Sequence, residues 1–530
     1  MAQSPHAPVD IPDSSVFDYL FGGLSDTELD AIALIDGSTG AETSYRQLVG
    51  QISLLAGSLA SRGVVVGDVI GILCPNIPAF ATVFHGVLRA GATATTINSL
   101  YTPDEITKQL TDAGATWLFT ISPMLPQAEA AAAAVGIPAD RLVVLDGADG
   151  HPSLRDLLGD GRQAPSVQFD PATHTAVLPY SSGTTGHPKG VMLSHRNLVA
   201  NVAQSSGSIG LGDRGLGAGD RVLAVLPFFH IYGMTVLLNF ALRERATLVT
   251  MPKFDLPEFL RIIAEARITW VFIAPPIAVA LAKHPLVEKY DLSSVNVVFS
   301  GAAPLDGSLA TIVAERLGCI VCQGYGMTEL SPVSHAIPVE WKDIDRSSIG
   351  VLLPNTEARI IDVESGADVE VPAEGQSPSG ELLVRGPQVM QGYLGNDDAT
   401  GRTLDADGWL HTGDIATVTA GGHYFIVDRL KELIKYKGYQ VAPAVLEAVL
   451  LTHPAIADAA VIGVLDDDGQ EIPKAFVVRQ PESDLDEAAV MEHVAGHVAP
   501  HEKVRSVEFI DVIPKSSSGK ILRKDLRART

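Results

Sequence analysis

Short apolar runs alternate along this chain with segments of helical apolar spacing, and no other feature of the sequence limits the possible folds so strongly. Helical spacing is found, for example, at residues 80–88 and 256–266. Buried strands are predicted at residues 69–73, 116–121, 142–145, 222–226, 247–251 and 270–274. Strands that alternate with helices in this way predict an α/β fold with largely parallel sheets.

The pattern changes from about Gly350 onward. Short strands at 358–362 and 380–386 lie between turn-rich segments, which indicates a smaller β-rich unit. After a dense charged run that starts at Asp428, a separate C-terminal α+β domain of about 100 residues is predicted. Its expected elements are strands at 458–465, 474–479 and 507–511 and a helix near 485–498.

Composition restricts the partners and the location of the protein. Apolar residues make up 46% and charged residues 19%, which is typical of a globular protein, and the net charge of −24 disfavours nucleic acid and anionic membranes as partners. The three cysteines are too few for a disulfide framework, and Cys319 and Cys322 in the apolar run CIVC are predicted to be buried strand residues. The sequence shows no signal-peptide pattern and no apolar run of membrane-spanning length, so we expect a cytoplasmic protein without an integral membrane segment.

Residues 181–191, SSGTTGHPKGV, form an unusually small and polar segment. A strand is predicted at 175–179 and Ser194 is a suitable N-cap, so we expect this loop to join the end of a strand to a helix, where α/β proteins bind ligands. Its glycines permit close backbone approach, and its hydroxyls, amides and Lys189 suit phosphate oxygens. No Ser or Thr follows Lys189 as in a Walker A loop, and composition alone leaves phosphate binding and an ordinary surface turn equally open.

The longer string YSSGTTGHPKGVMLSHRN, residues 180–197, resembles the signature loop of the adenylate-forming superfamily, which includes acyl-CoA synthetases, firefly luciferase and peptide-synthetase adenylation domains. Four further motifs of that superfamily follow in order: GYGMTE at 324–329, HTGD at 411–414, DRLKELIKYKGYQVAP at 428–443 and PKSSSGKILR at 514–523. The resemblance covers essentially the whole chain. It implies an N-terminal domain at 1–428 with two α/β subdomains and a small β-barrel-like subdomain, a hinge at 429–431, and a mobile α+β C-terminal domain at 432–530.

The resemblance also implies how ATP and Mg²⁺ are bound. The loop would hold the β- and γ-phosphates through Ser181, Ser182, Gly183, Thr184, Thr185 and Lys189. The remaining nucleotide-binding residues would be Gln323, Gly324, Tyr325 on the adenine, Thr328 on the α-phosphate, Asp414 and Arg429 on the ribose, and Lys431 at the pivot. Glu329 would help to hold Mg²⁺. Lys520 would be the catalytic lysine that bridges the carboxylate of the acid and the α-phosphate.

Within the superfamily, the sequence most resembles the 4-coumarate:CoA ligases, through LPFFHIYG at 226–233, MPKFD at 251–255, SGAAPL at 300–305 and KELIKYKGYQVAPAVLE at 431–447. That resemblance implies catalytic roles for His230, Lys435 and Gln440, and binding of coenzyme A by Lys253, Lys437 and Gly438. The acyl pocket would be lined by Tyr232, Val236, Ala302, Gly324, Gly326, Pro332 and Val333. Plant enzymes commonly carry Ser where this chain has Val236, and the loss of that hydroxyl weakens selection for a phenol. The resemblance therefore implies an aryl-propenoic acid of the cinnamate or 4-coumarate kind as the substrate, with a medium-chain fatty acid as the alternative.

Several other interpretations remain open at this point. Taken singly, Asp414 could be a turn residue, His230 a core histidine, and Arg429 with Lys431 part of a solvated helix face. Rival functions are luciferase-like oxygenation of the adenylate, loading of a carrier protein, and nucleotide sensing without catalysis. The expected partners are therefore a small carboxylic acid, ATP and coenzyme A, for a monomer or homodimer whose acid the sequence does not identify.

Overall fold

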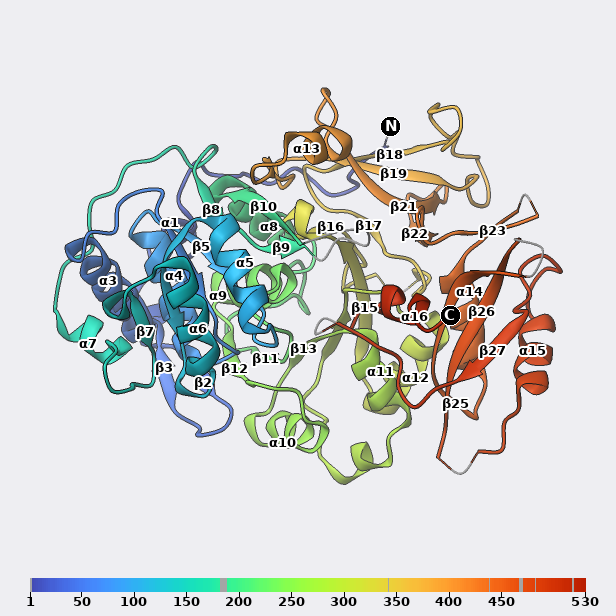
Figure 1. The fold of residues 1–530 in the computed structure, drawn as a ribbon, viewed down its shortest axis with the longest axis horizontal. Helices are drawn as coiled ribbons and strands as arrows, with labels where there is room; N and C mark the ends of the chain where they lie inside the picture. Colours follow the sequence, from blue (N-terminus) through green and yellow to red (C-terminus); the bar gives the residue numbers. More distant parts are fainter. Residues whose placement is uncertain are drawn as a thin grey trace.

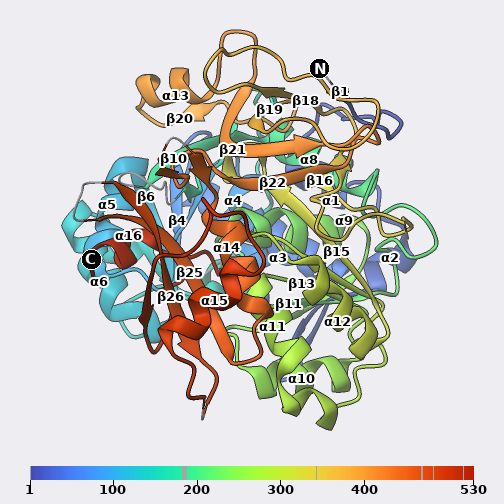
Figure 2. The same cartoon turned by 90° about the vertical axis from the view of Figure 1, so that its right-hand side faces the viewer.

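The computed structural model describes residues 2–181, 188–341, 343–437, 439–466, 470–481, 483–516 and 519–530. Within these ranges the chain forms two large α/β sheets, one antiparallel sheet and a C-terminal α+β unit. Figure 1 shows the C-terminal unit, in red, at the right-hand end of the molecule and the antiparallel sheet, in orange, above the α/β layers. Figure 2 shows the C-terminal unit facing the viewer in front of the larger part.

The first α/β sheet has the strand order β20-β10-β8-β5-β4-β6-β7, with β9 paired to β10. Its strands are β4 (Val69–Ile72), β5 (Thr93–Thr96), β6 (Ala115–Thr120), β7 (Leu142–Val144), β8 (Thr175–Val177), β9 (Tyr180–Ser181), β10 (Lys189–Ser194) and β20 (Gly392–Tyr393). Strands β4 to β8 pair in parallel, whereas β9, β10 and β20 pair antiparallel. The helices in residues 45–159 are α3 (Tyr45–Ser61), α4 (Pro78–Arg89), α5 (Pro103–Ala113), η1 (Ser122–Met124), α6 (Leu125–Val135), η2 (Ala139–Arg141) and α7 (Leu154–Gly159).

The second α/β sheet has the order β17-β16-β15-β14-β13-β11-β12-β2-β3. Its strands are β2 (Ile32–Asp36), β3 (Glu42–Ser44), β11 (Arg221–Ala224), β12 (Thr247–Thr250), β13 (Trp270–Ile273), β14 (Val297–Ser300), β15 (Ile320–Gly326), β16 (Val333–Ala336) and β17 (Val351–Leu352). The helices in residues 195–330 are α8 (His195–Ser206), the π-helix η3 (Tyr232–Phe240), α9 (Ala241–Arg243), α10 (Leu256–Ala266), α11 (Pro275–Lys283), η4 (Pro285–Lys289), α12 (Gly307–Leu317) and η5 (Thr328–Leu330). The central strands, β2 and β11 to β15, are buried apolar segments that pair in parallel.

The antiparallel sheet has the order β1-β18-β19-β21-β22. Its strands are β1 (Ala2–Gln3), β18 (Glu357–Ile361), β19 (Gly380–Arg385), β21 (Leu410–Val418) and β22 (Tyr424–Arg429), with α13 (Asp397–Thr403) beside it. The C-terminal unit comprises β23 (Ile434–Tyr436), β24 (Tyr439–Val441), α14 (Pro443–Thr452), β25 (Ile456–Leu465), β26 (Glu471–Arg479), α15 (Glu487–Ala495), β27 (Ser506–Phe509) and α16 (Arg523–Arg527). It has an apolar core of its own, formed mainly between α14, α15 and the sheet β25-β26-β27.

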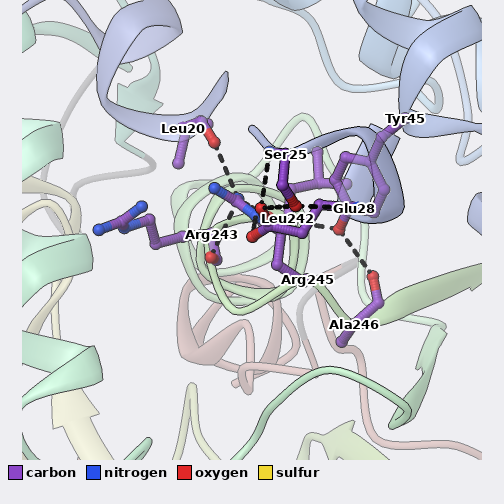
Figure 3. A network of polar contacts seen from close by, with 8 residues as sticks. All are labelled: Leu20, Ser25, Glu28, Tyr45, Leu242, Arg243, Arg245 and Ala246. Carbon is purple, nitrogen blue, oxygen red and sulfur yellow. Dashed lines mark hydrogen bonds and ion pairs between the residues drawn. The ribbon is translucent and has the colours of Figure 1, made fainter. Parts of the chain in front are cut away.

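Arg245 joins the start of the chain, including α1 (Val16–Phe21) and α2 (Asp26–Asp30), to the turn between α9 and β12 (Figure 3). Its guanidinium donates a 2.9 Å hydrogen bond to the carbonyl of Leu20 and pairs with the Glu28 carboxylate at 3.1 Å. Hydrogen bonds from Ser25 and Arg245 lower the pKa of Glu28 to about 2. The buried Tyr45 phenol donates to the carbonyls of Leu242 in α9 and Ala246 just before β12. These contacts fix the N-terminal helices against the second sheet.

The fold class predicted from the sequence is confirmed. Helix α10 has the predicted bounds, and every predicted strand of the α/β part is present within two residues at each end. Two local predictions are wrong. The loop after Ser181 does not lead directly to a helix, because residues 189–194 form β10, which pairs antiparallel with β8, β9 and β20 before α8 begins. Cys319 is half-buried and precedes β15, because the left-handed Gly318 ends α12 just before it, whereas Cys322 is buried on the strand as predicted.

Candidate active site

The predicted phosphate loop is the connection of a hairpin between β9 and β10. Ser181 and Lys189 are paired at its base, on neighbouring antiparallel strands. The Lys189 ammonium lies 4.1 Å from the centre of the Tyr393 ring, a cation–π contact. The predicted phosphate-binding residues Ser182, Gly183, Thr184 and Thr185 lie outside the described residues.

The carboxylate predicted to hold a metal lies beside this hairpin. Glu329 belongs to the short helix η5 and is only 6% exposed. Its Oε1 accepts a 2.7 Å hydrogen bond from the phenol of Tyr393, whose pKa is raised by burial and by this carboxylate. The structure therefore brings together Lys189 from β10, Tyr393 from β20 and Glu329 from η5.

A second polar group joins the end of β15 to the antiparallel sheet. The Tyr325 phenol donates a 2.6 Å hydrogen bond to Oδ2 of Asp414, which is 7% exposed on β21. Burial raises the pKa of Tyr325, and the Asp414 carboxylate adds to that shift. Arg429, paired with Asp414 across β21 and β22, approaches the same carboxylate at 3.4 Å. Asp414 is thus a buried, doubly contacted acid and not an ordinary turn residue.

The other predicted nucleotide residues lie on or just after β15. Gln323 is 2% exposed. Its side-chain oxygen accepts a hydrogen bond from the Leu305 amide, and its NH₂ group donates to the carbonyls of Leu305 and Arg346. This side chain therefore holds the strand in place. Gly324 is half-buried, and an added Cβ would lie 3.0 Å from the Phe299 ring. Thr328 is half-buried at the start of η5, next to Glu329.

Lys520, although it comes from the far end of the chain, is placed beside these groups. An added Cβ on the preceding Gly519 would lie 3.3 Å from the Ala274 side chain, so the C-terminal segment contacts the N-terminal domain there. Burial lowers the pKa of Lys520 to about 8, and the Arg429 charge adds to this effect, whereas the Asp414 and Glu329 carboxylates oppose it. These electrostatic interactions show that the tail lysine lies near the residues of three other motifs.

Two ion pairs hold the segment that carries Lys520. Lys515 pairs with Asp458 at 2.6 Å, and Arg523 pairs with the buried Glu447 at 2.6 Å. Between these two ion pairs, the amide of Lys520 donates to the hydroxyl of Ser516, and the carbonyl of Lys520 accepts from the Ser516 amide. The described tail residues on both sides of Lys520 are therefore held within the C-terminal unit.

His230 follows β11 and lies near Lys520. Burial lowers the pKa of His230 to about 4, with a further contribution from the Lys520 charge, so the imidazole is neutral at neutral pH. Tyr232 begins the π-helix η3, and its phenol donates to the Phe299 carbonyl at 3.3 Å. Its ring packs on Gly301, where an added Cβ would come within 2.8 Å of the ring.

The other predicted acyl-pocket residues belong to three segments that meet near these groups. Val236 is fully buried on η3, and Ala302 adopts a left-handed backbone with φ of 71° just after β14. Gly326 and Val333 pair across β15 and β16. Pro332 precedes β16, and its carbonyl lies where a Cβ on Gly326 would have to be. The predicted set is therefore distributed over neighbouring ends of η3, β14 and β15–β16.

Two residues predicted to bind coenzyme A and the predicted catalytic residue Lys435 are exposed on the surface. Lys253 is exposed after β12, and Lys437 is exposed with its ammonium 5.3 Å from the centre of the Tyr436 ring. Lys435 is exposed on β23, with its amide bonded to Glu471 in the same domain. Strand β23 lies at the upper right in Figure 1, above β26 of the C-terminal unit. Gln440 is placed only by its backbone pairing with Lys435, and Gly438 lies outside the described residues.

A buried hydrogen bond joins the residues before the predicted hinge to those after it. Lys431 is exposed in a turn after β22. Next to it, the buried Asp428 carboxylate accepts a 2.8 Å hydrogen bond from the amide of Ala444 in the first turn of α14. The apolar side chains of Ile415, Leu433 and Ala442 form a small cluster beside this bond. The last strand of the antiparallel sheet is thereby joined to the first helix of the C-terminal unit.

Tyr393 is a site residue that was not predicted from the sequence. Its only sequence signal is an aromatic residue after glycine in QGYLGN, which is indistinguishable from a core tyrosine. The two predicted residues that it contacts are about 60 and 200 positions upstream, so only tertiary structure reveals the group.

Two negative observations apply to the described ranges alone. No three His, Cys, Asp or Glu side chains there are arranged as a ready metal site. In the same ranges every helix is too short or too polar to traverse a lipid bilayer.

Comparison with known proteins gives consistent results over the whole chain. The family model of AMP-binding enzymes matches residues 25–394, and that of the AMP-binding enzyme C-terminal domain matches residues 445–520. The chain is 42% identical over 525 residues to 4-coumarate–CoA ligase 5 of Oryza sativa subsp. japonica, covering 98% of this chain and 95% of the relative. It is 38% identical over 517 residues to a probable 4-coumarate–CoA ligase 1 of Dictyostelium discoideum, covering 94% and 92%.

Solved structures show the same architecture. ATP-bound MatB from Rhodopseudomonas palustris superimposes with a TM-score of 0.87 at 28% identity, covering 98% of this chain and 99% of MatB. The anthranilate CoA ligase AuaEII, in complex with anthranoyl-AMP, gives a TM-score of 0.88 at 27% identity, covering 98% and 97%. The chain therefore belongs to the adenylate-forming superfamily of AMP-binding enzymes, among the AMP-forming acid–CoA ligases of the 4-coumarate–CoA ligase type.

Proposed function

We propose that this enzyme activates an aryl-propenoic acid with ATP and transfers the acyl group to coenzyme A. The observation that carries the proposal is the position of Lys520: the preceding Gly519 lies against Ala274 of the N-terminal domain, and the charges of Asp414, Glu329 and Arg429, about 90 to 190 residues away in sequence, act on the pKa of the lysine. ATP-bound MatB and the anthranoyl-AMP complex of AuaEII support the same nucleotide chemistry.

In the first half-reaction the carboxylate of the acid attacks the α-phosphorus of ATP, and pyrophosphate leaves. Two anions must approach each other, so positive charge has to be placed where negative charge accumulates. Lys520 supplies that charge between the acid and the α-phosphate, while Lys189 binds the departing phosphates. Asp414 and Arg429 hold the ribose, and Tyr325, fixed by its bond to Asp414, packs against the adenine.

The residues present fit a magnesium ion. Oε1 of Glu329 is engaged by Tyr393, and no described residue hydrogen-bonds its Oε2. Magnesium prefers hard oxygen ligands and commonly binds through one or two carboxylates together with substrate phosphates and water. Glu329 would therefore hold the ion against the triphosphate, where it neutralises phosphate charge.

In the second half-reaction the thiol of coenzyme A attacks the acyl carbonyl and AMP leaves. We infer that the domain at 432–530 rotates about the hinge at 429–431 relative to the domain at 1–428, which withdraws Lys520 and brings Lys435 and Gln440 inward. Lys253, Lys437 and Gly438 would bind coenzyme A. The neutral His230 at the mouth of the pocket would then change position as Lys520 leaves.

The acid is proposed from the pocket residues Tyr232, Val236, Ala302, Gly326 and Val333 together with Pro332. An aromatic ring and small or branched apolar groups suit a flat aryl-propenoic chain. Val236 is fully buried and apolar, so it offers no partner to a phenolic hydroxyl. A medium-chain fatty acid is the alternative that the same apolar lining favours.

We expect Val236→Ser to raise the preference for 4-coumarate over cinnamate by about fivefold, because a new hydroxyl can bond the phenol and is left unpaired by cinnamate. The measurement is the ratio of kcat/KM for the two acids. Val236→Ala is the matched control, since it shortens the side chain without adding a hydroxyl. An equal ratio in the Ser and Ala variants would contradict this pocket assignment.

We expect Lys437→Glu to raise the KM for coenzyme A about five- to tenfold and to leave the KM for ATP unchanged, because an exposed phosphate contact is replaced by repulsion. Lys289→Glu, an exposed lysine on η4, makes the same charge change elsewhere and serves as the control. An unaltered KM for coenzyme A in the Lys437 variant would remove this residue from the proposed thiol-substrate site.

The proposed function itself is tested by acid-dependent release of pyrophosphate across cinnamates, benzoates and fatty acids, with and without coenzyme A. Release that requires an acid, followed by thioester formation only with coenzyme A, is the expected result. The highest kcat/KM for a fatty acid would select the alternative substrate class. Light emission with luciferin in place of thioester formation would instead support oxygenation.

A further inference from the structure

One tyrosine contacts both charged side chains that the proposed function assigns to the phosphate end of ATP. The phenol of Tyr393 donates to Glu329 at 2.7 Å, and the face of its ring lies 4.1 Å from the Lys189 ammonium. Tyr393 is 4% exposed, so these contacts are made inside the protein. The side chain thus stands between an anion and a cation that belong to different motifs.

A direct ion pair between these two groups would oppose substrate binding. Each would neutralise the other, and the pair would have to be broken before Lys189 could bind phosphate and Glu329 a cation. In the described part of the chain no ion pair joins Lys189 to Glu329. A tyrosine is a neutral spacer that still offers a favourable contact to each, since its ring face attracts a cation and its hydroxyl donates to a carboxylate.

The backbone around Tyr393 fixes the spacer with respect to both groups. Tyr393 pairs with Val191 on β10, and the amide of Leu394 donates to the Gly190 carbonyl at 2.8 Å, directly after Lys189. On the other side, the amide of Met390 donates to the Glu329 carbonyl at 2.9 Å. The segment 390–394 is therefore bonded to both main-chain segments that carry the charges.

We propose that Tyr393 is a positioning residue that keeps Lys189 and Glu329 apart and orients each for magnesium-bound pyrophosphate. This proposal rests on the proposed function, because it takes the triphosphate end of ATP to lie between these two side chains. It adds a residue on β20 to the site, and it assigns different roles to the hydroxyl and to the ring of this tyrosine. The hydroxyl orients the carboxylate of Glu329, and the ring orients the ammonium of Lys189.

Two variants separate these tasks. Tyr393→Phe keeps the ring under Lys189 and removes only the hydrogen bond to Glu329, so the dissociation constant of Mn²⁺ in the presence of ATP, measured by electron paramagnetic resonance, should rise about tenfold. Tyr393→Leu also removes the ring, and the dissociation constant of a fluorescent ATP analogue without metal should rise a further threefold or so. Thioester formation from supplied acyl-adenylate, which uses neither metal nor triphosphate, should change less than twofold in the Phe variant.

Tyr45→Phe is the matched control, since it also removes hydrogen bonds of a buried phenol but lies far from the phosphate residues in the N-terminal helix α3. It should leave Mn²⁺ binding unchanged. The proposal is overturned if Tyr393→Phe binds Mn²⁺ like the unaltered protein, or if both half-reactions fall equally in that variant. If the wild-type protein releases no pyrophosphate with any acid, the proposed function is refuted instead. If the wild type is active and Tyr393→Phe has the wild-type dissociation constant for Mn²⁺, only the role of Tyr393 is refuted.

Discussion

Replacement of Lys520 by alanine should slow adenylate formation by about 100- to 1000-fold, the cost of removing one preorganised charge from the transition state. Thioester formation from supplied acyl-adenylate should stay within about threefold of wild type, since the proposed rotation takes Lys520 away before the thiol reacts. Single-turnover measurement of pyrophosphate release and of thioester formation distinguishes the two steps. The asymmetry is the expected result because Lys520 is placed among Asp414, Glu329 and Arg429 in this conformation.

Lys524→Ala is the matched control, because it removes the same charge from an exposed position four residues further along the tail. It should leave both steps unchanged. Since the pKa of Lys520 is lowered to about 8, its ammonium form is lost as the pH rises through that value, so kcat/KM for ATP in adenylation should fall above about pH 8. Equal loss of both half-reactions in Lys520→Ala would contradict the proposed rotation.

Glu329→Gln should reduce adenylate formation by roughly 100-fold at millimolar magnesium, because an amide binds a hard cation far less strongly than a carboxylate does. The substitution preserves the size of the side chain and an oxygen that can still accept from Tyr393. The loss should therefore be partly recovered at high magnesium concentration, whereas the loss in Lys520→Ala should not. Pyrophosphate release as a function of magnesium concentration measures the difference.

Glu244→Gln provides the comparison for this substitution. Glu244 is a partly buried carboxylate whose pKa is raised by burial, and it bonds to Ser206 away from the phosphate residues. Its amide variant should show the magnesium dependence of the wild type. A Glu329→Gln enzyme with wild-type rate and wild-type magnesium dependence would exclude Glu329 as a metal ligand.

Much of the architecture could be predicted because local pattern and tertiary environment agree. The apolar run at 270–274 is a buried parallel strand, and the predicted helix at 256–266 has an amphipathic pattern with a proline in its first turn. Residues 189–194 were harder to predict, since KGVMLS has no clear alternation and becomes a strand only by pairing with β8, β9 and β20. Strand formation there depends on partners that are distant in sequence.

The sequence by itself determined the α/β class, the separate C-terminal unit and, through five short motifs, the superfamily, because these properties reside in local spacing and in residue identity. The tertiary structure alone decided which of those motifs meet. It placed Lys520 where the charges of Asp414 and Glu329 act on it, and it inserted Tyr393 between Lys189 and Glu329. The physical reason is that charge–charge and hydrogen-bond interactions depend on distance in space, and the folding of two sheets and a tail brings together groups that sequence spacing leaves unrelated.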